Sequence, residues 1–129
     1  MRYLTLAEAM TIAEAVTGIA ASTLARVSRL ELLESAIHAP QAGFGDVEFH
    51  PDLVAKAAVL VVRIARNHPL PDGNKRLAWQ ALTMFCALNG RTLEASTDDA
   101  VALMFGIAAG DTDEATVAGW IEERLSSDG

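Results

Sequence analysis

Residues 68–76 spell His-Pro-Leu-Pro-Asp-Gly-Asn-Lys-Arg, and this run divides two apolar, helix-forming segments. The segment before it is apolar almost all round from Ala57 to Ile64, which predicts a helix at the centre of a bundle. The two prolines exclude helix from Asn67 to Pro71, because proline lacks a backbone N–H and fixes φ. Leu70, between the prolines, is expected to anchor the run in the core. The chain should therefore fold around two long helices joined by a short, stiff turn that carries reactive side chains.

Helix-forming residues dominate the 129-residue chain, which is poor in aromatic residues. The expected helices run from Thr5 to about Val16, from Ser28 to Pro40, from Pro51 to about Arg66, from Gly73 to Leu88, from Asp98 to about Ala108 and from Asp111 to about Leu125. Residues 41–50 contain two glycines and are expected to form a loop, residues 91–93 a short extended piece, and residues 126–129 a loose tail. We expect an all-α, compact single-domain bundle of about six helices over residues 1–129, with its core within about 3–125.

Several helix starts carry recognisable signals. Thr5-Leu6-Ala7-Glu8 and Ser28-Arg29-Leu30-Glu31 both match the capping box, in which a hydroxyl and a glutamate satisfy free N–H groups of the first turn. Pro51 suits the first position of the third helix. Ser96 or Thr97 is expected to cap the fifth helix.

The charge of the chain narrows its possible partners. The net charge is −7 and the sequence pI is about 4.8, which argues against direct nucleic-acid binding through the overall field. The basic residues that gather around the turn are Arg63, Arg66, Lys75 and Arg76. A local positive patch on an acidic protein favours a small anionic ligand.

The number of cysteines and the length of the apolar runs limit the redox chemistry and the location that we expect. Cys86 is the single cysteine, which excludes an internal disulfide and a cysteine-based zinc site. The longest apolar run, residues 57–62, is far too short to cross a membrane. No secretion signal is recognised at the start of the chain. We therefore expect a cytoplasmic protein with no membrane partner.

The start of the fourth helix predicts an anion site. Its first backbone N–H groups have no partner within the helix, and the helix dipole places positive charge there. Gly73 lets a ligand approach the backbone closely. Lys75 and Arg76 add two cations at a pole where the dipole disfavours each by about 0.3–1 kcal/mol. Because a bound phosphate or carboxylate would remove this conflict, we expect an anionic ligand at this helix end.

The polar residues around this helix end each have two interpretations. Asp72 is either the N-cap of the fourth helix or a magnesium ligand, since magnesium is held by one or two carboxylates together with phosphate oxygens. His68 is either an ordinary surface histidine or a general base that takes a proton from a hydroxyl nucleophile. Asn74 either caps the helix or donates to a phosphate or a metal-bound water. Arg66 either stabilises the C-terminal end of the third helix or reaches the anion. The residues alone thus support a magnesium-and-phosphate site with a histidine base.

The run from His68 to Arg76 resembles the signature of the Fic/Doc family. That signature has a histidine, an apolar anchor, an acidic residue, a small residue, an asparagine, a glycine or lysine, and an arginine. Leu70 stands where the family usually has phenylalanine. Arg66, two residues before the histidine, and Asn89-Gly90, at the end of the following helix, resemble the Doc (death-on-curing) branch. The resemblance covers about residues 3–125 and implies the small all-helical Fic/Doc fold.

The resemblance also implies an activity. Fic relatives that transfer AMP have a glycine where this chain has Lys75, whereas Doc-type relatives have lysine and transfer the γ-phosphoryl group of ATP. The implied target is a threonine of elongation factor Tu, and the implied result is arrested translation. Position by position, His68 would be the catalytic base and Asp72 would hold Mg²⁺. The residues implied to bind ATP are Arg66, Gly73, Asn74, Lys75 and Arg76.

A partner protein and two alternatives complete the expectations. The resemblance implies a separate antitoxin, whose C-terminal segment would lie in a surface groove of the toxin. The chain has no recognisable internal inhibitory helix of the Ser/Thr-x-x-x-Glu-Gly/Asn kind, which agrees with a separate inhibitor. The alternatives are an AMP transferase acting on a protein hydroxyl and a catalytically silent module that only binds a partner. Lys75 argues against the first, and the intact His68, Asp72 and Arg76 argue against the second.

Overall fold

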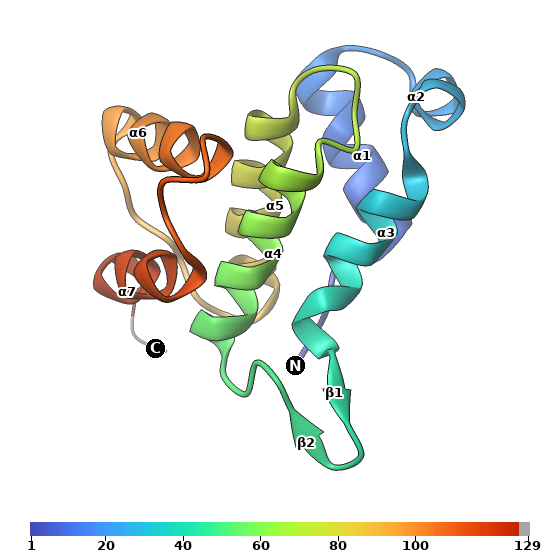
Figure 1. Cartoon of the computed structure of the whole chain (residues 1–129). Helices are drawn as coiled ribbons and strands as arrows, with labels where there is room; N and C mark the ends of the chain where they lie inside the picture. Colours follow the sequence, from blue (N-terminus) through green and yellow to red (C-terminus); the bar gives the residue numbers. More distant parts are fainter. Residues whose placement is uncertain (127–129) are drawn as a thin grey trace.

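The computed structural model describes residues 1–126 and shows an almost entirely helical fold (Figure 1). Within these residues, seven α-helices are joined by short loops, one 3₁₀ turn and one hairpin. The α-helices are α1 (Leu6–Thr17), α2 (Ala21–Val27), α3 (Leu30–His38), α4 (Leu53–Asn67), α5 (Asn74–Leu88), α6 (Thr97–Ala108) and α7 (Glu114–Arg124). The 3₁₀ turn is η1 (Ala39–Gln41), and the antiparallel hairpin pairs β1 (Gly43–Phe44) with β2 (Val47–Glu48). The expected all-α fold class is confirmed. No helix in this range is long and apolar enough to span a membrane.

Helix α4 is the most deeply buried element of the fold. Its side chains from Lys56 to Val62, and then Ile64 and Ala65, are buried, because nearly every residue of these turns is apolar. The α4–α5 pair lies in the middle, with α1–α3 on one side and α6–α7 on the other (Figure 1). Helices α3, α5, α6 and α7 all pack against α4. The central position expected for this segment is confirmed.

One of the two expected capping boxes is present. The Thr5 hydroxyl accepts a hydrogen bond from the Glu8 N–H at 3.1 Å, and the Glu8 carboxylate accepts from the Thr5 N–H at 3.0 Å. The second expectation is wrong, because Arg29 rather than Ser28 is the N-cap residue of α3, and no side chain of residues 1–126 caps this helix. Ser28 instead ends α2, and its hydroxyl is buried without a hydrogen-bond partner in the same range.

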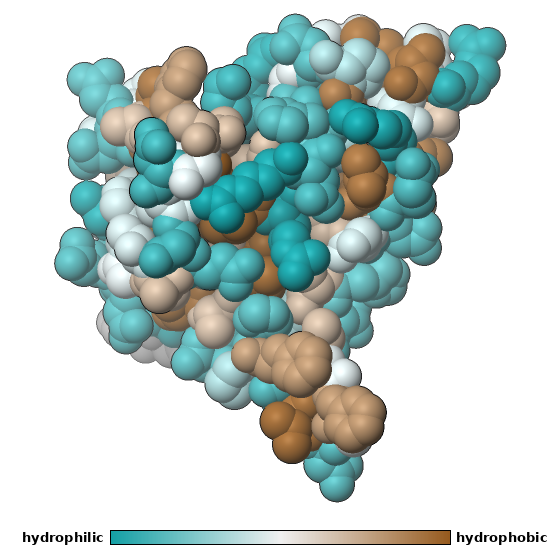
Figure 2. All heavy atoms as spheres, in the orientation of Figure 1, coloured by the Kyte–Doolittle hydropathy of each residue, from teal (hydrophilic) through white to brown (hydrophobic). Residues whose placement is uncertain are grey.

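Two elements are not among those expected from the sequence. Helix α2 is only seven residues long, which is too short to show a clear apolar period. The two strands of the hairpin have two residues each, so residues 41–50 carry no alternating pattern and were wrongly expected to be a loop throughout. The hairpin presents exposed Phe44 and Val47, with Phe49 just beyond it. Figure 2 shows an apolar group at its lower end, where Figure 1 places the hairpin.

Three helix starts are defined by short polar side chains. Pro51 precedes α4 rather than opening it, because Asp52 is the N-cap and its carboxylate accepts a first-turn N–H at 2.8 Å. Ser96 caps α6 by accepting a first-turn N–H at 3.1 Å, which confirms one of the two residues expected there. Helix α7 begins after Asp113, its N-cap, and not at Asp111. Each cap satisfies an N–H group that the helix itself leaves free.

The segment that follows α5 pairs with the residues that follow α7. Leu93 and Leu125 form an isolated antiparallel bridge, which confirms the short extended piece expected at residues 91–93. The Ser126 N–H donates to the Thr92 carbonyl at 2.8 Å, and the Thr92 N–H donates to the Ser126 hydroxyl at 2.8 Å. A loose tail is therefore wrong for Ser126, and residues 127–129 lie outside the described part of the chain.

A buried lysine fastens the hairpin to α4. Lys56 is 2% exposed, and its Nζ donates to the Pro40 carbonyl at 2.9 Å and to the Glu48 carboxylate at 3.0 Å. Burial disfavours the charged ammonium, but its interactions with Glu48 and Tyr3 outweigh that effect and raise the pKa of Lys56. The side chain therefore remains a cation that joins α4, η1 and β2.

Replacing Lys56 by methionine should lower the free energy of unfolding by about 1–3 kcal/mol, because the Pro40 carbonyl then loses its donor inside the protein. Urea denaturation followed by circular dichroism measures this loss. Glu48→Gln is the matched comparison and should cost less than Lys56→Met, since its amide oxygen can still accept from the ammonium and the Glu48 side chain is 54% exposed. A Lys56→Met protein as stable as the wild type would show that the ammonium contributes nothing net.

The single thiol provides a pH-dependent test of the core. Burial raises the pKa of Cys86 from its ordinary value of 9.0 to about 11, with a smaller opposing effect of the Arg91 charge. We expect a disulfide reagent near pH ~8 to label the folded protein far more slowly than the guanidinium-unfolded chain.

Because the folded pKa lies above the unfolded value, the contribution of Cys86 to stability is complete below pH 9.0 and is lost as pH rises through about 11. Between pH 9.0 and about 11, the urea midpoint should therefore fall more for the wild type than for Cys86→Ala. An equal fall in both proteins, or rapid labelling of the folded protein, would contradict a buried Cys86 thiol with a raised pKa.

Candidate functional site

The turn that joins α4 to α5 is anchored in the core. It lies at the upper end of these two central helices in Figure 1. Pro69 is buried and Leu70 is 3% exposed, so Leu70 fills the anchor position as expected. The Asn74 side chain ties the turn to α5, because its Oδ1 accepts from the Leu70 N–H and its Nδ2 donates to the Leu70 carbonyl, both at 2.9 Å. The amide thus holds the turn rather than capping the helix, and one of its two N–H groups remains for a ligand.

The N-terminus of α5 is open. Its N-cap residue is Gly73, with φ of 83°, and no side chain in residues 1–126 caps it. A Cβ at Gly73 would lie 3.1 Å from the Thr17 methyl group, so both the backbone conformation and the space favour glycine. The first three N–H groups of the helix have no acceptor in the described chain. Together with the helix dipole they form the anion site that the sequence predicts.

Two cations stand at this positive pole. The side chains of Lys75 and Arg76 are exposed, and neither forms an ion pair with any other residue of the described range. The Lys75 ammonium lies 5.0 Å from the centre of the Phe105 ring on α6, within the range of a cation–π contact. The positive charge at the helix start therefore has no compensating carboxylate within the described chain.

Asp72 immediately precedes the N-cap. Its side chain is exposed and makes no hydrogen bond or ion pair within residues 1–126. The interpretation of Asp72 as the helix cap is wrong, because Gly73 occupies that position. No group of three or more His, Cys, Asp or Glu residues in this part of the chain could hold a metal ion. A metal at Asp72 would therefore need further oxygen ligands from a bound molecule or water, and its role as a magnesium ligand stays a prediction.

His68 ends α4 in an unusual backbone conformation. Its φ of 48° and ψ of 58° are left-handed, which costs a non-glycine residue about 1–3 kcal/mol. The imidazole is exposed and has no hydrogen-bond partner in the described residues. Its carbonyl accepts from Nη2 of Arg29 at 2.8 Å, and the Arg29 N–H donates to the Pro69 carbonyl at 2.8 Å. Within the described residues the ring is therefore available to accept a proton, and its catalytic role stays a prediction.

Arg66 lies near the end of α4 but is engaged elsewhere. Its Nε donates to the Ile107 carbonyl at 3.2 Å, and its Nη2 donates to the Thr112 carbonyl. These bonds tie α4 to the end of α6 and the turn that follows. The structure thus gives Arg66 a tethering contact, and its part in nucleotide binding stays a prediction.

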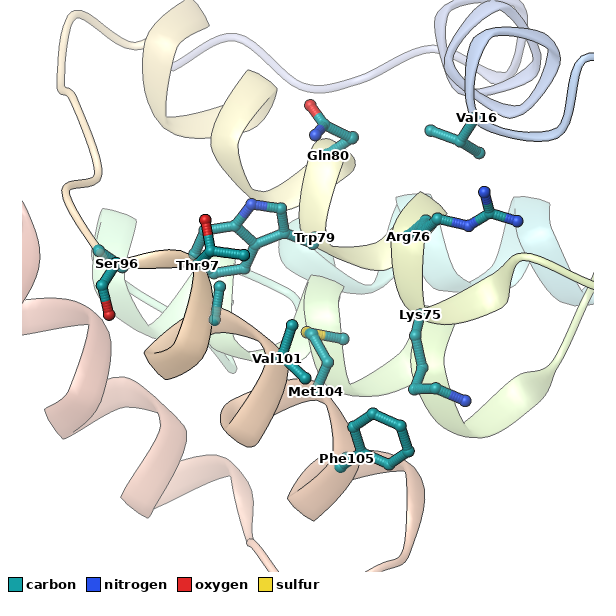
Figure 3. A pocket seen from close by; sticks show the side chains of 12 residues that line it. Val16, Lys75, Arg76, Trp79, Gln80, Ser96, Thr97, Val101, Met104 and Phe105 are labelled. Atoms are coloured by element: carbon teal, nitrogen blue, oxygen red, sulfur yellow. The ribbon is translucent and has the colours of Figure 1, made fainter.

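A cavity of about 550 Å³ opens beside the two cations, between α5 and α6. Figure 3 shows Lys75 and Arg76 at one end of it, with Trp79 of α5 and Phe105 of α6 among the side chains around it. Residues 68–72 of the turn are not part of its lining. The cavity therefore continues from the cations along α5 rather than toward His68.

A second cavity of about 700 Å³ lies between α1 and α5. It shares Val16 and Gln80 with the first cavity, so the two adjoin. We call the two cavities together the α5 groove. Its lining is mainly apolar, with the two cations at one end and Arg91 at the other.

Two residues at the site had no local signal in the sequence. Arg29 reaches the turn from 39 positions away, and Phe105 contacts Lys75 from α6, the next helix along the chain. Both contacts depend on how α3 and α6 pack, which no short motif records.

Comparison with known proteins agrees with this geometry. The sequence profile described as the Fic/DOC family matches residues 3–86, a range that contains the whole turn and most of α5. The chain is also similar to the protein named Toxin Doc from Mycolicibacterium smegmatis, with 44% identity over 89 residues that cover 67% of this chain and 68% of that protein. The profile spans more than half of the chain and includes the uncapped helix start, its two cations and the preceding histidine. On this evidence the chain belongs to the Fic/DOC family.

Proposed function

We propose that this chain is the toxin of a toxin–antitoxin pair and that it transfers the γ-phosphoryl group of ATP to a threonine of a protein. Elongation factor Tu is the target that the family resemblance suggests. The name of the relative, Toxin Doc, supports the toxin role. The observation that carries the reaction is the open N-terminus of α5, at the end of a turn that begins with the His68 imidazole. Within residues 1–126 the two cations at this helix end form no ion pair, and the imidazole forms no hydrogen bond.

The triphosphate would occupy the anion site of α5. Three free N–H groups and the helix dipole point to that position, and Lys75 and Arg76 add two full charges. Without an anion, each cation is disfavoured there by about 0.3–1 kcal/mol. A bound phosphate attracts both the helix pole and the two cations, and these attractions outweigh the repulsion between them, so the cluster is stabilised by the ligand it would bind. The remaining N–H of Asn74 can join the same phosphate.

The residues present also fit a magnesium ion. Asp72 offers an exposed carboxylate with no other partner in the described chain, and magnesium is commonly held by one carboxylate, waters and phosphate oxygens. When bound, the ion would neutralise charge on the phosphates and orient them. Because Asp72 belongs to no group of three or more His, Cys, Asp or Glu residues in the described chain that could hold a metal ion by itself, we expect the ion to bind together with the nucleotide.

His68 would act on the attacking hydroxyl. A nitrogen of its imidazole accepts the proton from the threonine oxygen. That oxygen forms a bond to the γ-phosphorus, the bond from the γ-phosphorus to the bridging oxygen breaks, and ADP leaves with the electron pair. The backbone N–H groups of α5 and Lys75 stabilise the negative charge on the phosphates during this exchange.

Lys75 supports γ-phosphoryl transfer over AMP transfer. In the family that this chain resembles, the relatives that transfer AMP have a glycine at this position. Here a lysine side chain fills that space and rests on the Phe105 ring, 5.0 Å from its centre. AMP transfer remains the second candidate, because the anion site would bind either end of the triphosphate.

The α5 groove is the surface we assign to the antitoxin. It is mainly apolar, it is framed by α1, α5 and α6, and it begins at the two cations. An amphipathic segment could bury its apolar face there. Such a segment would also lie against Lys75 and Arg76, so its binding would block the phosphate site.

A labelled-ATP experiment tests the reaction. We incubate the antitoxin-free protein with Mg²⁺, elongation factor Tu and ATP labelled at either the γ or the α phosphate. We expect only the γ label to reach the target. His68→Ala should lower the rate by about 10²-fold or more, whereas the matched control His38→Ala, an exposed histidine on α3, should keep it. Transfer of the α label would support the AMP reaction, and no transfer of either label by folded protein would support a silent binding module.

Magnesium dependence should act through Asp72. We expect ATP, measured by isothermal titration calorimetry, to bind more tightly with Mg²⁺ than with EDTA, and Asp72→Asn to remove most of this difference because a neutral amide is a weak magnesium ligand. Asp46→Asn, in the exposed hairpin turn, is the control. Mg²⁺ titrated alone should give no measurable binding. An Asp72→Asn protein with the full magnesium effect would exclude this carboxylate from the metal site.

A further inference from the structure

His68 is held in a backbone conformation that its residue type disfavours. Its φ and ψ are left-handed, and no other non-glycine residue between 1 and 126 has a positive φ. A residue with a Cβ adopts this conformation only where its surroundings impose it. The contacts that hold His68 in this conformation therefore decide where its Cβ and its ring lie.

Arg29 supplies two such contacts. Its Nη2 donates to the His68 carbonyl at 2.8 Å, and its backbone N–H donates to the Pro69 carbonyl at 2.8 Å. Arg29 is the N-cap residue of α3, so the start of α3 carries both donors to the end of α4. Arg29 therefore donates hydrogen bonds to two consecutive carbonyl groups directly after α4, those of His68 and Pro69.

The other contacts of the turn do not reach His68. Asn74 pairs with Leu70, and Leu70 is anchored by burial. Within the described chain, the guanidinium of Arg29 is the one side chain that hydrogen-bonds to His68. The bond is charge-assisted, and arginine remains protonated at any pH at which the protein works.

We propose that Arg29 is a positioning residue: it holds the backbone of His68 and so sets the direction in which the His68 imidazole points. The proposal rests on His68 being the general base of the function proposed above. Rotation about the φ and ψ of His68 redirects its Cα–Cβ bond, and a general base must come within about 2.6–3.2 Å of the group it deprotonates. Without the guanidinium, His68 would relax toward the commonly allowed regions of φ and ψ. A displacement of about 1 Å can lower a rate about a hundredfold.

Three variants test this role. Arg29→Met removes the guanidinium and keeps an aliphatic chain, and Arg29→Lys keeps a cationic donor. Arg26→Met is the matched control, because Arg26 is exposed on α2 and has no hydrogen bond or ion pair in residues 1–126. With labelled ATP and elongation factor Tu, well below each melting temperature, we expect Arg29→Met to lower kcat about tenfold or more and leave the KM for ATP within about twofold. Arg29→Lys should recover part of the loss, and Arg26→Met should match the wild type.

A second readout does not require any transfer. The backbone NMR chemical shifts of His68, which report φ and ψ, should move in Arg29→Met and stay in Arg26→Met. If the wild type transfers no label but these shifts move, the proposed reaction fails and the control of the His68 backbone by Arg29 stands. If the wild type transfers label, a kcat for Arg29→Met equal to that of Arg26→Met, or a change in KM alone, would overturn the positioning role. Unmoved His68 shifts would overturn it in either case.

Discussion

Helix α4 is buried on nearly every side, and this burial places the reactive turn. Moving or rolling α4 would expose apolar side chains from several turns at once, at about 25 cal/mol for each Å². His68 is the residue that ends this helix, so the backbone of the expected base is fixed by the core. Helix α5 packs along α4 and begins directly after the turn. Two core helices therefore hold the imidazole and the anion site at the two ends of residues 68–73.

The turn gathers several unfavourable features within a few residues. His68 has a left-handed backbone, the first N–H groups of α5 have no acceptor in the described chain, and Lys75 and Arg76 lie at the pole where the helix dipole disfavours cations. Each feature costs on the order of 1 kcal/mol. A fold selected only for stability would place a capping carboxylate here, yet the nearby Asp72 does not cap. Such a concentration of local costs is typical of a site whose ligand compensates for them.

Local patterns predicted the parts of the fold that local physics decides. The proline-containing turn, the buried α4 and the Thr5 capping box all follow from residues within about one helical turn of each other. The Ser28 box failed because α2 ends at that residue, and the hairpin was missed because its strands are too short to alternate. At the site, the sequence correctly predicted the two cations and the glycine at the start of α5. It did not predict which residues form hydrogen bonds with the turn. Asn74 pairs with the Leu70 backbone, and Arg29 reaches the turn from another helix; such pairings depend on packing.

The match to the Fic/DOC family divides the site into two parts. Residues 68–76, which carry the expected base, the carboxylate and the cations, lie inside the matched range 3–86. The wall of the α5 groove that α6 contributes, including Phe105, lies beyond it. Substitutions in α6 can therefore reshape the groove and the contact with Lys75 without altering His68 or the free N–H groups of α5. The α6 wall and the phosphate site meet only at the start of α5, through the contact of Phe105 with Lys75, whereas the lining from α1 and most of that from α5 lie inside the matched range.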